Sequence, residues 1–279
     1  MIQWYFMPDV HIAHTEESKK RIFEAYREWG VPESFLHGNR MQSPEFLRLL
    51  MAIQTRIPDM NARAMPSSPD PDDPALMAFP HNAKARWNSC ERTFRESEVH
   101  GVMSRLPLFW QIEPSLFAAC QKAGAFILIN DVGNMPLGAA ALRDAEIDAI
   151  VTDSEDARTF SAYLADNDVS LGRVWIVVHS PHNGGWEFPN ALKDSSVRVA
   201  QEVHAFPGVT VLEQCPVLQN KRESRFHVSD GYTSEHDGNV LALSGCEDAP
   251  LPLFRYELPL PMRIQEVCAC GKTVFAVAQ

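Results

Sequence analysis

The fold is decided by the stretch from Ala123 to Val178, which reads AGAFILINDVGNMPLGAAALRDAEIDAIVTDSEDARTFSAYLADNDVSLGRVWIVV. Short apolar runs alternate in it with segments of helical periodicity. These predict, in order, strand 123–130, helix 137–145, strand 149–152, helix 154–165 and strand 174–178. The first run is continuously apolar, which predicts a strand that is buried on both faces. Such βαβ alternation predicts an α/β fold with a mostly parallel sheet flanked by helices.

The sequence around this stretch divides the chain into four parts. Residues 1–64 show helical periodicity and predict a helical N-terminal segment. Residues 65–74 contain four prolines and several aspartates, and because proline removes backbone donors we interpret them as a linker. Residues 75–225 form the predicted α/β core. Residues 226–279 hold short strand-like segments broken by Gly and Pro, which predict an antiparallel β subregion.

The composition excludes several classes of protein. The 279 residues include 25 Lys and Arg against 36 Asp and Glu, a net charge of −11. Non-specific binding of nucleic acid needs a dense basic surface, so nucleic acid is not expected as a partner. No apolar run approaches the ~20 residues of a membrane-spanning helix, and residues 1–10 lack the pattern of a signal peptide. We therefore expect a cytoplasmic protein that does not bind a membrane.

Several metal-binding residue types gather in the last quarter of the chain: Cys215, His227, Cys268 and Cys270. Thiolates and imidazoles are the usual zinc ligands, and in a Cys-x-Cys pair followed by Gly271 two sulfurs can approach one ion from a tight turn. Cys246 is a competing ligand. The alternative interpretation is that these are buried or incidental thiols and a surface histidine. Spacing alone leaves both interpretations open.

Motifs in the last third of the chain resemble those of the adenylate-forming superfamily, in its phenylacetate-CoA ligase-like branch. The stretch 201–209 resembles the segment with the Tyr-Gly-x-x-Glu motif, and Glu202 stands at the position of the glutamate. Similar elements follow in the family's order: Glu-Cys at 213–215, His-Ile at 226–228, the Arg-Tyr element at 248–256 and Cys-x-Cys-Gly-Arg at 268–272. A weaker similarity extends upstream to residue 85.

The resemblance implies a fold, cofactors and site residues. Residues 85–279 would form the large N-terminal domain of such a ligase. In members of the branch that keep them, the residues corresponding to Cys215, His227, Cys268 and Cys270 bind a structural Zn2+. By the same resemblance Glu202 would hold Mg2+, and Arg255 would contact the ribose or phosphate of ATP or AMP.

The sequence departs from the family where ATP would bind. The stretch 78–84, which corresponds to the Gly-rich phosphate loop, contains a proline and no glycine. Arg198-Val199 replaces the Tyr-Gly that packs on adenine, and Leu260 stands in place of the ribose aspartate. The chain ends eight residues after Gly271, so we expect the mobile C-terminal lid with its catalytic lysine to be absent.

Two functions of different classes follow from these observations. The first is an atypical ligase homologue that binds an acyl or aromatic carboxylate, or its adenylate, without full CoA-ligase activity. The second is a non-catalytic, zinc-braced scaffold that docks a related enzyme or a carrier protein. A homodimer is a further expectation. ATP binding that depends on Glu202 and Arg255 would distinguish the first function from the second.

Overall fold

The computed structural model describes residues 11–12, 16–33, 40, 43–53, 56, 60–61, 79–80, 88–106, 114–180, 189–193, 196–206, 209–214, 224–245 and 251–277. The chain divides into two compact units. One is Arg86–His227, and the other combines Met1–Ala85 with Val228–Gln279. The predicted linker 65–74, Cys215 and Cys246 lie outside the described residues, and of the stretch 78–84 only Phe79 and Pro80 are described.

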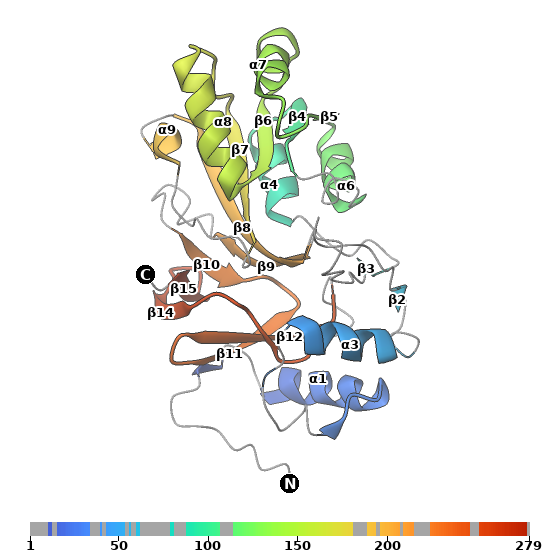
Figure 1. Ribbon diagram of the computed structural model, residues 1–279. Helices are drawn as coiled ribbons and strands as arrows, with labels where there is room; N and C mark the ends of the chain where they lie inside the picture. The colour runs from blue at the N-terminus through green and yellow to red at the C-terminus, as the bar shows by residue number, and fades with distance from the viewer. Residues whose placement is uncertain are drawn as a thin grey trace. The chain divides into compact units, whose positions relative to one another are not determined.

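The unit Arg86–His227 is built on a mostly parallel sheet (Figure 1). Its strands are β4 (Gly101–Ser104), β5 (Phe126–Ile129), β6 (Ala149–Asp153), β7 (Val174–His179), β8 (Arg198–Phe206), β9 (Val209–Gln214) and β10 (Arg225–Val228). They follow the order β10-β9-β8-β7-β6-β4-β5. The neighbours from β5 to β8 pair in parallel, and β9 pairs antiparallel to β8. The predicted strands at 149–152 and 174–178 are confirmed.

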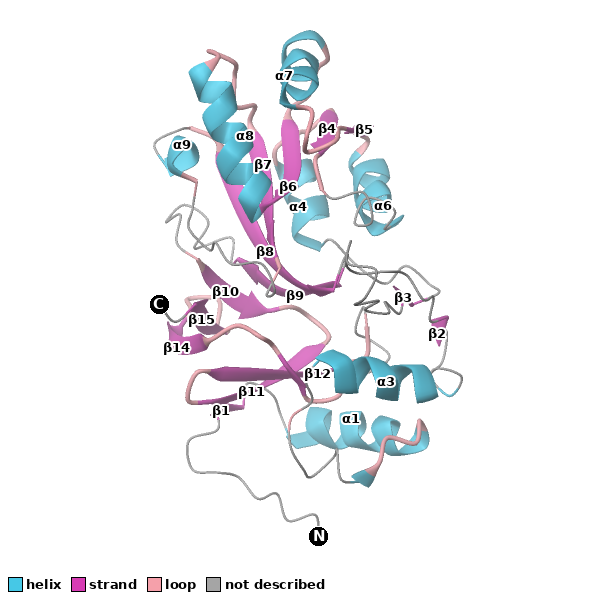
Figure 2. Cartoon of the chain, viewed as in Figure 1, coloured by secondary structure: helices cyan, strands magenta, loops and turns pink. Residues whose placement is uncertain are grey.

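Helices cover both faces of this sheet (Figure 2). They are α4 (Asn88–Glu96), α6 (Pro114–Ala123), α7 (Met135–Asp144), α8 (Ser154–Asp166) and α9 (Asn190–Lys193). Side chains alternate along the strands, so Ile176 packs with α4 and α6 on one face, whereas Trp175 and Val177 pack with α7, α8 and α9 on the other. This arrangement confirms the α/β fold class and the predicted helices at 137–145 and 154–165.

The prediction that the strand at 123–130 is buried on both faces is wrong. Strand β5 lies at the end of the sheet and pairs only with β4 among the described strands. Phe126 is 48% exposed and Ile129 is 49% exposed. A continuous apolar run is compatible with a central strand and with an unprotected edge, and only the topology distinguishes the two.

A fully buried arginine joins the carboxyl ends of three parallel strands. Arg105, directly after β4, forms an ion pair with Asp156 of α8, with both N···O distances at 2.9 Å. Its guanidinium also donates to the Asn130 side chain and to the carbonyls of Asp131 and Val132, which follow β5. Thr152 of β6 donates to the same Asp156 carboxylate at 2.6 Å. The charge is therefore paired and its donors are satisfied, as burial of an ion requires.

The second unit combines helices with antiparallel strands. Its helices are α1 (Glu16–Glu28) and α3 (Ser43–Ile53). Its strands are β1 (His11–Ile12), β2 (Met60–Asn61), β3 (Phe79–Pro80), β11 (Tyr232–Asp237), β12 (Val240–Gly245), β13 (Tyr256–Glu257), β14 (Met262–Val267) and β15 (Thr273–Val277). The order β1-β11-β12-β13 makes a four-stranded antiparallel sheet, and β14 with β15 forms a hairpin. This confirms the antiparallel region near the C-terminus.

Aromatic side chains pack α1 and α3 against the segment around β13. The ring of Tyr26 lies 4.8 Å from that of Phe254, centroid to centroid, and Phe46 lies 5.4 Å from Tyr256. The Tyr26 hydroxyl also donates to the carbonyl of Gly245 at 2.9 Å. Buried tyrosines need such a partner, so this bond fixes α1 on the end of β12. No described helix is long and apolar enough to cross a membrane.

Substitution of Arg105 by alanine is expected to lower the free energy of unfolding by about 3–5 kcal/mol, because Asp156 is left buried without its counter-ion. The control is Arg95→Ala, since Arg95 pairs with Glu91 on the surface of α4 and its loss should cost at most about 0.5 kcal/mol. Urea unfolding of the two variants measures both values. Equal losses would contradict the structural role of Arg105.

Candidate functional site

Glu202 is fully buried in strand β8 and is engaged by neighbouring side chains. Its carboxylate oxygen Oε2 lies 2.8 Å from Nε2 of His204 and accepts a hydrogen bond of 3.0 Å from the Thr210 hydroxyl. His204 stands two residues after Glu202, so both side chains point to the same face of the strand. Thr210 comes from the adjacent strand β9. The carboxylate is thus held by the protein itself.

A buried thiol completes the surroundings of Glu202. Cys90 of α4 places its Sγ 3.9 Å from Oε1 of Glu202. Burial, with the nearby Glu202 carboxylate as a second cause, raises the pKa of Cys90 well above its usual value. The thiol therefore stays protonated, and because the thiolate is the reactive form, Cys90 is not an activated nucleophile.

His179 and Gln201 form a second buried polar pair. His179 ends β7, and its Nε2 lies 2.9 Å from the Oε1 of Gln201 on β8. Burial lowers the pKa of His179 to about 4, although the hydrogen bond with Gln201 opposes this shift. The imidazole is therefore neutral at physiological pH. A neutral, fully buried histidine of this kind supports the packing of β7 on β8.

Arg255 lies in the second unit and is also paired within the protein. Its Nη2 lies 2.8 Å and its Nε 3.2 Å from the two carboxylate oxygens of Glu235 on β11. Its backbone N–H donates to the Ser244 hydroxyl at 3.2 Å, and its φ of +47° is in the left-handed region. The two-point pair with Glu235 occupies the Nε/Nη2 edge of the guanidinium, one of the edges that could clamp a phosphate.

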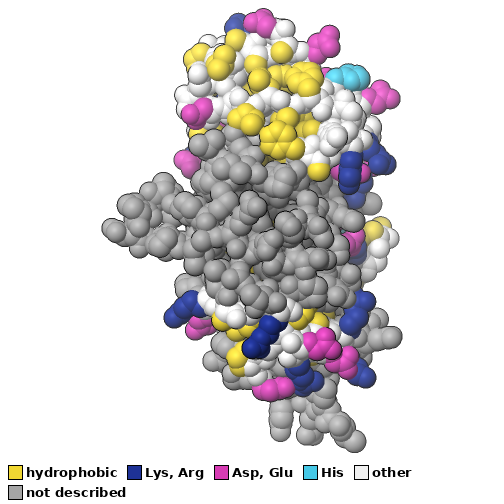
Figure 3. Space-filling model, turned by 90° about the vertical axis from the view of Figure 1, so that its right-hand side faces the viewer, with side chains coloured by type: hydrophobic (Ala, Val, Ile, Leu, Met, Phe, Trp, Pro, Cys, Tyr) yellow, Lys and Arg dark blue, Asp and Glu magenta, His cyan; other side chains and the backbone are white. Residues whose placement is uncertain are grey.

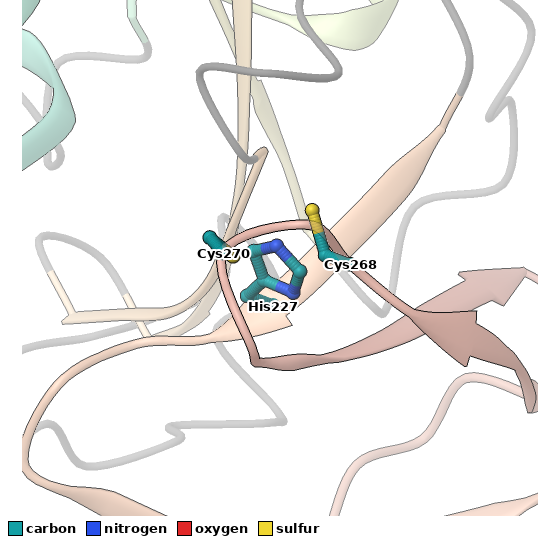
Figure 4. A group of neighbouring side chains, drawn as sticks. All are labelled: His227, Cys268 and Cys270. Carbon is teal, nitrogen blue, oxygen red and sulfur yellow. The ribbon is translucent and has the colours of Figure 1, made fainter.

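Three of the predicted metal ligands come together (Figure 4). One ligand atom each of His227 on β10 and of Cys268 and Cys270 lies within 4.8 Å of the other two. The cysteines stand on the turn between β14 and β15, and the strand order places β15 next to β10. Cys268 and His227 are buried, and Cys270 is exposed. A tetrahedral ion with ligand bonds of roughly 2.0–2.3 Å fits such a donor set.

The turn that carries the two cysteines has the local geometry the sequence predicts. Gly271 adopts a φ of +85°, which side chains other than glycine rarely allow, and its N–H donates to the carbonyl of Cys268 at 2.8 Å. The N–H of Cys268 donates to the carbonyl of Lys272 at 2.9 Å. These bonds close the hairpin tightly, so that both sulfurs are presented at one end of it.

The structure thus brings together part of the predicted site. His227, Cys268 and Cys270 converge, whereas Glu202 and Arg255 each have partners of their own. Sequence reasoning missed those partners. The i, i+2 spacing of Glu202 and His204 on a strand could have indicated the first, but Glu235 carries no local signal because it is 20 residues from Arg255.

Comparison with known proteins assigns the fold. No family model matches the chain, and no curated protein sequence matches it. Among solved structures, a 2-hydroxyisobutyryl-CoA ligase with bound 2-HIB-AMP and CoA superposes with a TM-score of 0.53 at 10% identity, covering 94% of this chain and 69% of the ligase. VinN in complex with L-aspartate gives a TM-score of 0.51 at 14% identity, covering 72% of this chain and 56% of VinN.

MenE of E. coli, bound to a phenylether-linked analogue of OSB-AMS, gives a TM-score of 0.50 at 14% identity, covering 80% of this chain and 48% of MenE. This chain therefore spans about half the length of VinN and MenE. At these identities the likeness concerns the fold alone. The described part of the chain has the fold of the large N-terminal domain of the adenylate-forming ligases.

The pKa of His179 predicts a pH dependence of stability. Its value of about 4 in the folded protein lies below the ordinary 6.5, so the folded state binds fewer protons than the unfolded state. The stabilisation is present above pH 6.5 and is lost as the pH falls toward 4, by a total of about 3 kcal/mol. Urea unfolding from pH 7 to 4 should show this loss in the wild type and a flatter profile in His179→Gln. His100→Gln, which changes an exposed histidine, should keep the wild-type profile, and identical profiles for both variants would contradict the assignment.

Proposed function

We propose that this protein binds an acyl or aromatic carboxylate, or its adenylate, and does not complete ATP-dependent ligation to CoA. The fold supports the ligand class by analogy, because a ligase of the same fold has been solved with an adenylate and CoA. We place the protein in the cytoplasm, where reducing conditions keep the thiols of Cys268 and Cys270 available as ligands.

The observation that carries the binding proposal lies at the switch point of the parallel sheet. The strand order turns at β4, with β5 on one side and β6 on the other, and open α/β sheets bind ligands at the carboxyl ends of such strands. Ser104 ends β4 and Asn130 follows β5, and the two are joined by a backbone hydrogen bond of 2.9 Å. Both residues are buried, yet the hydroxyl of Ser104 and the side-chain amide nitrogen Nδ2 of Asn130 have no hydrogen-bond partner.

The Ser104 hydroxyl is an unpartnered donor that suits a carboxylate. Ser104 pairs with Ile129 in the register of β4 and β5, so the side chain of Asn130 points to the opposite face of the sheet and is not part of the same proposed contact. A buried polar group without a partner costs about 1–3 kcal/mol, and a ligand that accepts its hydrogen bond recovers that cost. Arg105 stands beside Ser104, but Asp156 neutralises its charge. The ligand would therefore be recognised by a neutral donor, which favours a carboxylate or an ester of one over a triphosphate.

The contacts of Glu202 and Arg255 support the proposal that the protein does not complete ATP-dependent ligation. In the role that the sequence predicts, Glu202 would hold Mg2+ and Arg255 would contact the nucleotide. The carboxylate of Glu202 is buried against His204 and Thr210, and the guanidinium of Arg255 is paired with Glu235. Recruiting either group for ATP would break interactions that the folded protein already makes, so we propose that neither performs that role here.

We further propose a structural Zn2+ held by His227, Cys268 and Cys270, with Cys215 as the fourth ligand. The support is the donor set, since two thiols and an imidazole converge on one end of a hairpin. When bound, zinc would have a structural role and no part in binding the carboxylate: it would tie β10 to the turn between β14 and β15.

Carboxylate binding is tested by titrating a panel of acyl and aromatic carboxylates and non-hydrolysable acyl-adenylate analogues by calorimetry. We expect saturable binding of at least one of them, weakened about tenfold in Ser104→Ala because one hydrogen bond to a charged group is lost. Ser161→Ala is the matched control, because the buried Ser161 hydroxyl already donates to the carbonyl of Arg158. Absence of binding by the whole panel would contradict the proposal and favour the scaffold function.

Zinc is tested by elemental analysis of the purified protein, which should contain about one ion per chain. Cys268→Ser and Cys270→Ser should each lose the metal and unfold at a lower temperature, since binding of structural zinc stabilises the folded state. Cys120→Ala changes a buried thiol in the core between the parallel sheet and helices α4 and α6, and this variant should keep its zinc. The zinc site would be contradicted if the wild type were as stable without metal as with zinc added, or if both serine variants kept their full zinc content.

A further inference from the structure

Strand β5 leaves one backbone edge of the sheet without a described partner. The N–H of Phe126 donates to the carbonyl of His100 and the N–H of Asn130 to that of Ser104, both at 2.9 Å. These residues therefore direct their backbone groups toward β4. Because the direction alternates along a strand, Ile127 and Ile129 direct their N–H and C=O groups outward. No described strand pairs with that outer edge.

The outward edge is also apolar. The structure describes six exposed large hydrophobic residues, and five of them lie on β5 or on the helices before and after it: Phe117, Phe126, Leu128, Ile129 and Leu137. We call this group the β5 patch. Figure 3 shows yellow side chains gathered near the top of this face, where β5, α6 and α7 lie. An edge strand is normally protected by a charge, a proline or a bulge, and β5 has none of these.

We propose that β5 pairs antiparallel with β5 of a second copy of this chain. The alternation of its backbone groups restricts the register to pairs of outward-facing residues, and the register centred on Leu128 uses both outward residues of β5 in each copy. Ile127 of one copy would face Ile129 of the other, and Leu128 would face itself on the two-fold axis. Each Ile127–Ile129 pair exchanges two backbone hydrogen bonds, so the seam makes four, and the two sheets become one. Phe126 and Leu128 of both copies then cover each other on one face of the seam.

The absence of charge along β5 favours contact between two copies of the chain at this strand. The chain carries a net charge of −11, which opposes close contact between copies over most of its surface. The segment Ala123–Asn130 contains no ionisable side chain. In the proposed register, Asp131 at one end of the strand approaches the last turn of the other copy's α6, which carries the exposed Lys122. Because Lys122 already pairs with Glu91 of its own chain at 3.1 Å, the seam is favoured by its lack of charge and not by opposite charges at its ends.

The test is sedimentation velocity of the full chain over a range of concentrations. Leu128→Lys sets two ammonium groups against each other on the two-fold axis, and Ile129→Pro removes an outward N–H that β4 does not use. Each should weaken dimerisation at least tenfold, while the circular dichroism spectrum and the melting temperature show that the variant is folded. Val267→Lys is the control, because Val267 is 66% exposed on β14 and lies outside the β5 patch.

Hydrogen exchange locates the seam independently. The amides of Ile127 and Ile129 should be protected in the wild-type dimer and exchange rapidly in Leu128→Lys. A wild type that is monomeric at about 100 μM would overturn the proposal. A dimer that persists in both Leu128→Lys and Ile129→Pro would also overturn it. So would protection of the Ile127 and Ile129 amides that appears only when a different protein is added. None of these outcomes depends on whether a carboxylate binds.

Discussion

The ion pair between Arg105 and Asp156 is the interaction on which the α/β unit depends. It is fully buried at the point where the sheet reverses its strand order, and it ties the ends of β4, β5 and β6 to the start of α8. A guanidinium offers five donors in a fixed plane, and here carboxylate, amide and carbonyl oxygens accept from it. These bonds hold the loop after β5 against Arg105, and the Ser104 hydroxyl and the side-chain amide nitrogen of Asn130 have no partners, on opposite faces of the sheet.

The same principle, that a charge removed from water must be paired, explains why the surroundings of Glu202 and Arg255 differ from those of a nucleotide site. Glu202 accepts from Thr210 and lies against His204, and Arg255 is joined to Glu235. In a working ATP site such groups meet Mg2+ and phosphate instead. The chain has the fold of the ligases, and the charged groups of Glu202 and Arg255 are engaged by other residues of the protein. We propose that ligand recognition falls to neutral groups at the end of β4.

The sequence predicted much of the fold because the deciding signals are local. The runs 149–152 and 174–178 are short, apolar and rich in β-branched residues, and they form central strands. The Cys-x-Cys-Gly turn was equally readable, since a glycine at positive φ and two adjacent thiols belong to one hairpin. The position of β5 at an edge was not readable, because its exposure follows from strand order. The partners of Arg105 and Arg255 lie 51 and 20 residues away, where no periodicity points to them.

The central claim is that this is a ligase fold whose charged residues no longer serve ATP. Pyrophosphate exchange measures it most directly, since the exchange reports formation of the adenylate from ATP and a carboxylate. With saturating Mg-ATP and each carboxylate that binds, we expect no exchange above the protein-free rate, in the wild type as in Glu202→Gln and Arg255→Ala. Exchange by the wild type that either substitution abolishes would contradict it, because Glu202 or Arg255 would then be acting on the nucleotide.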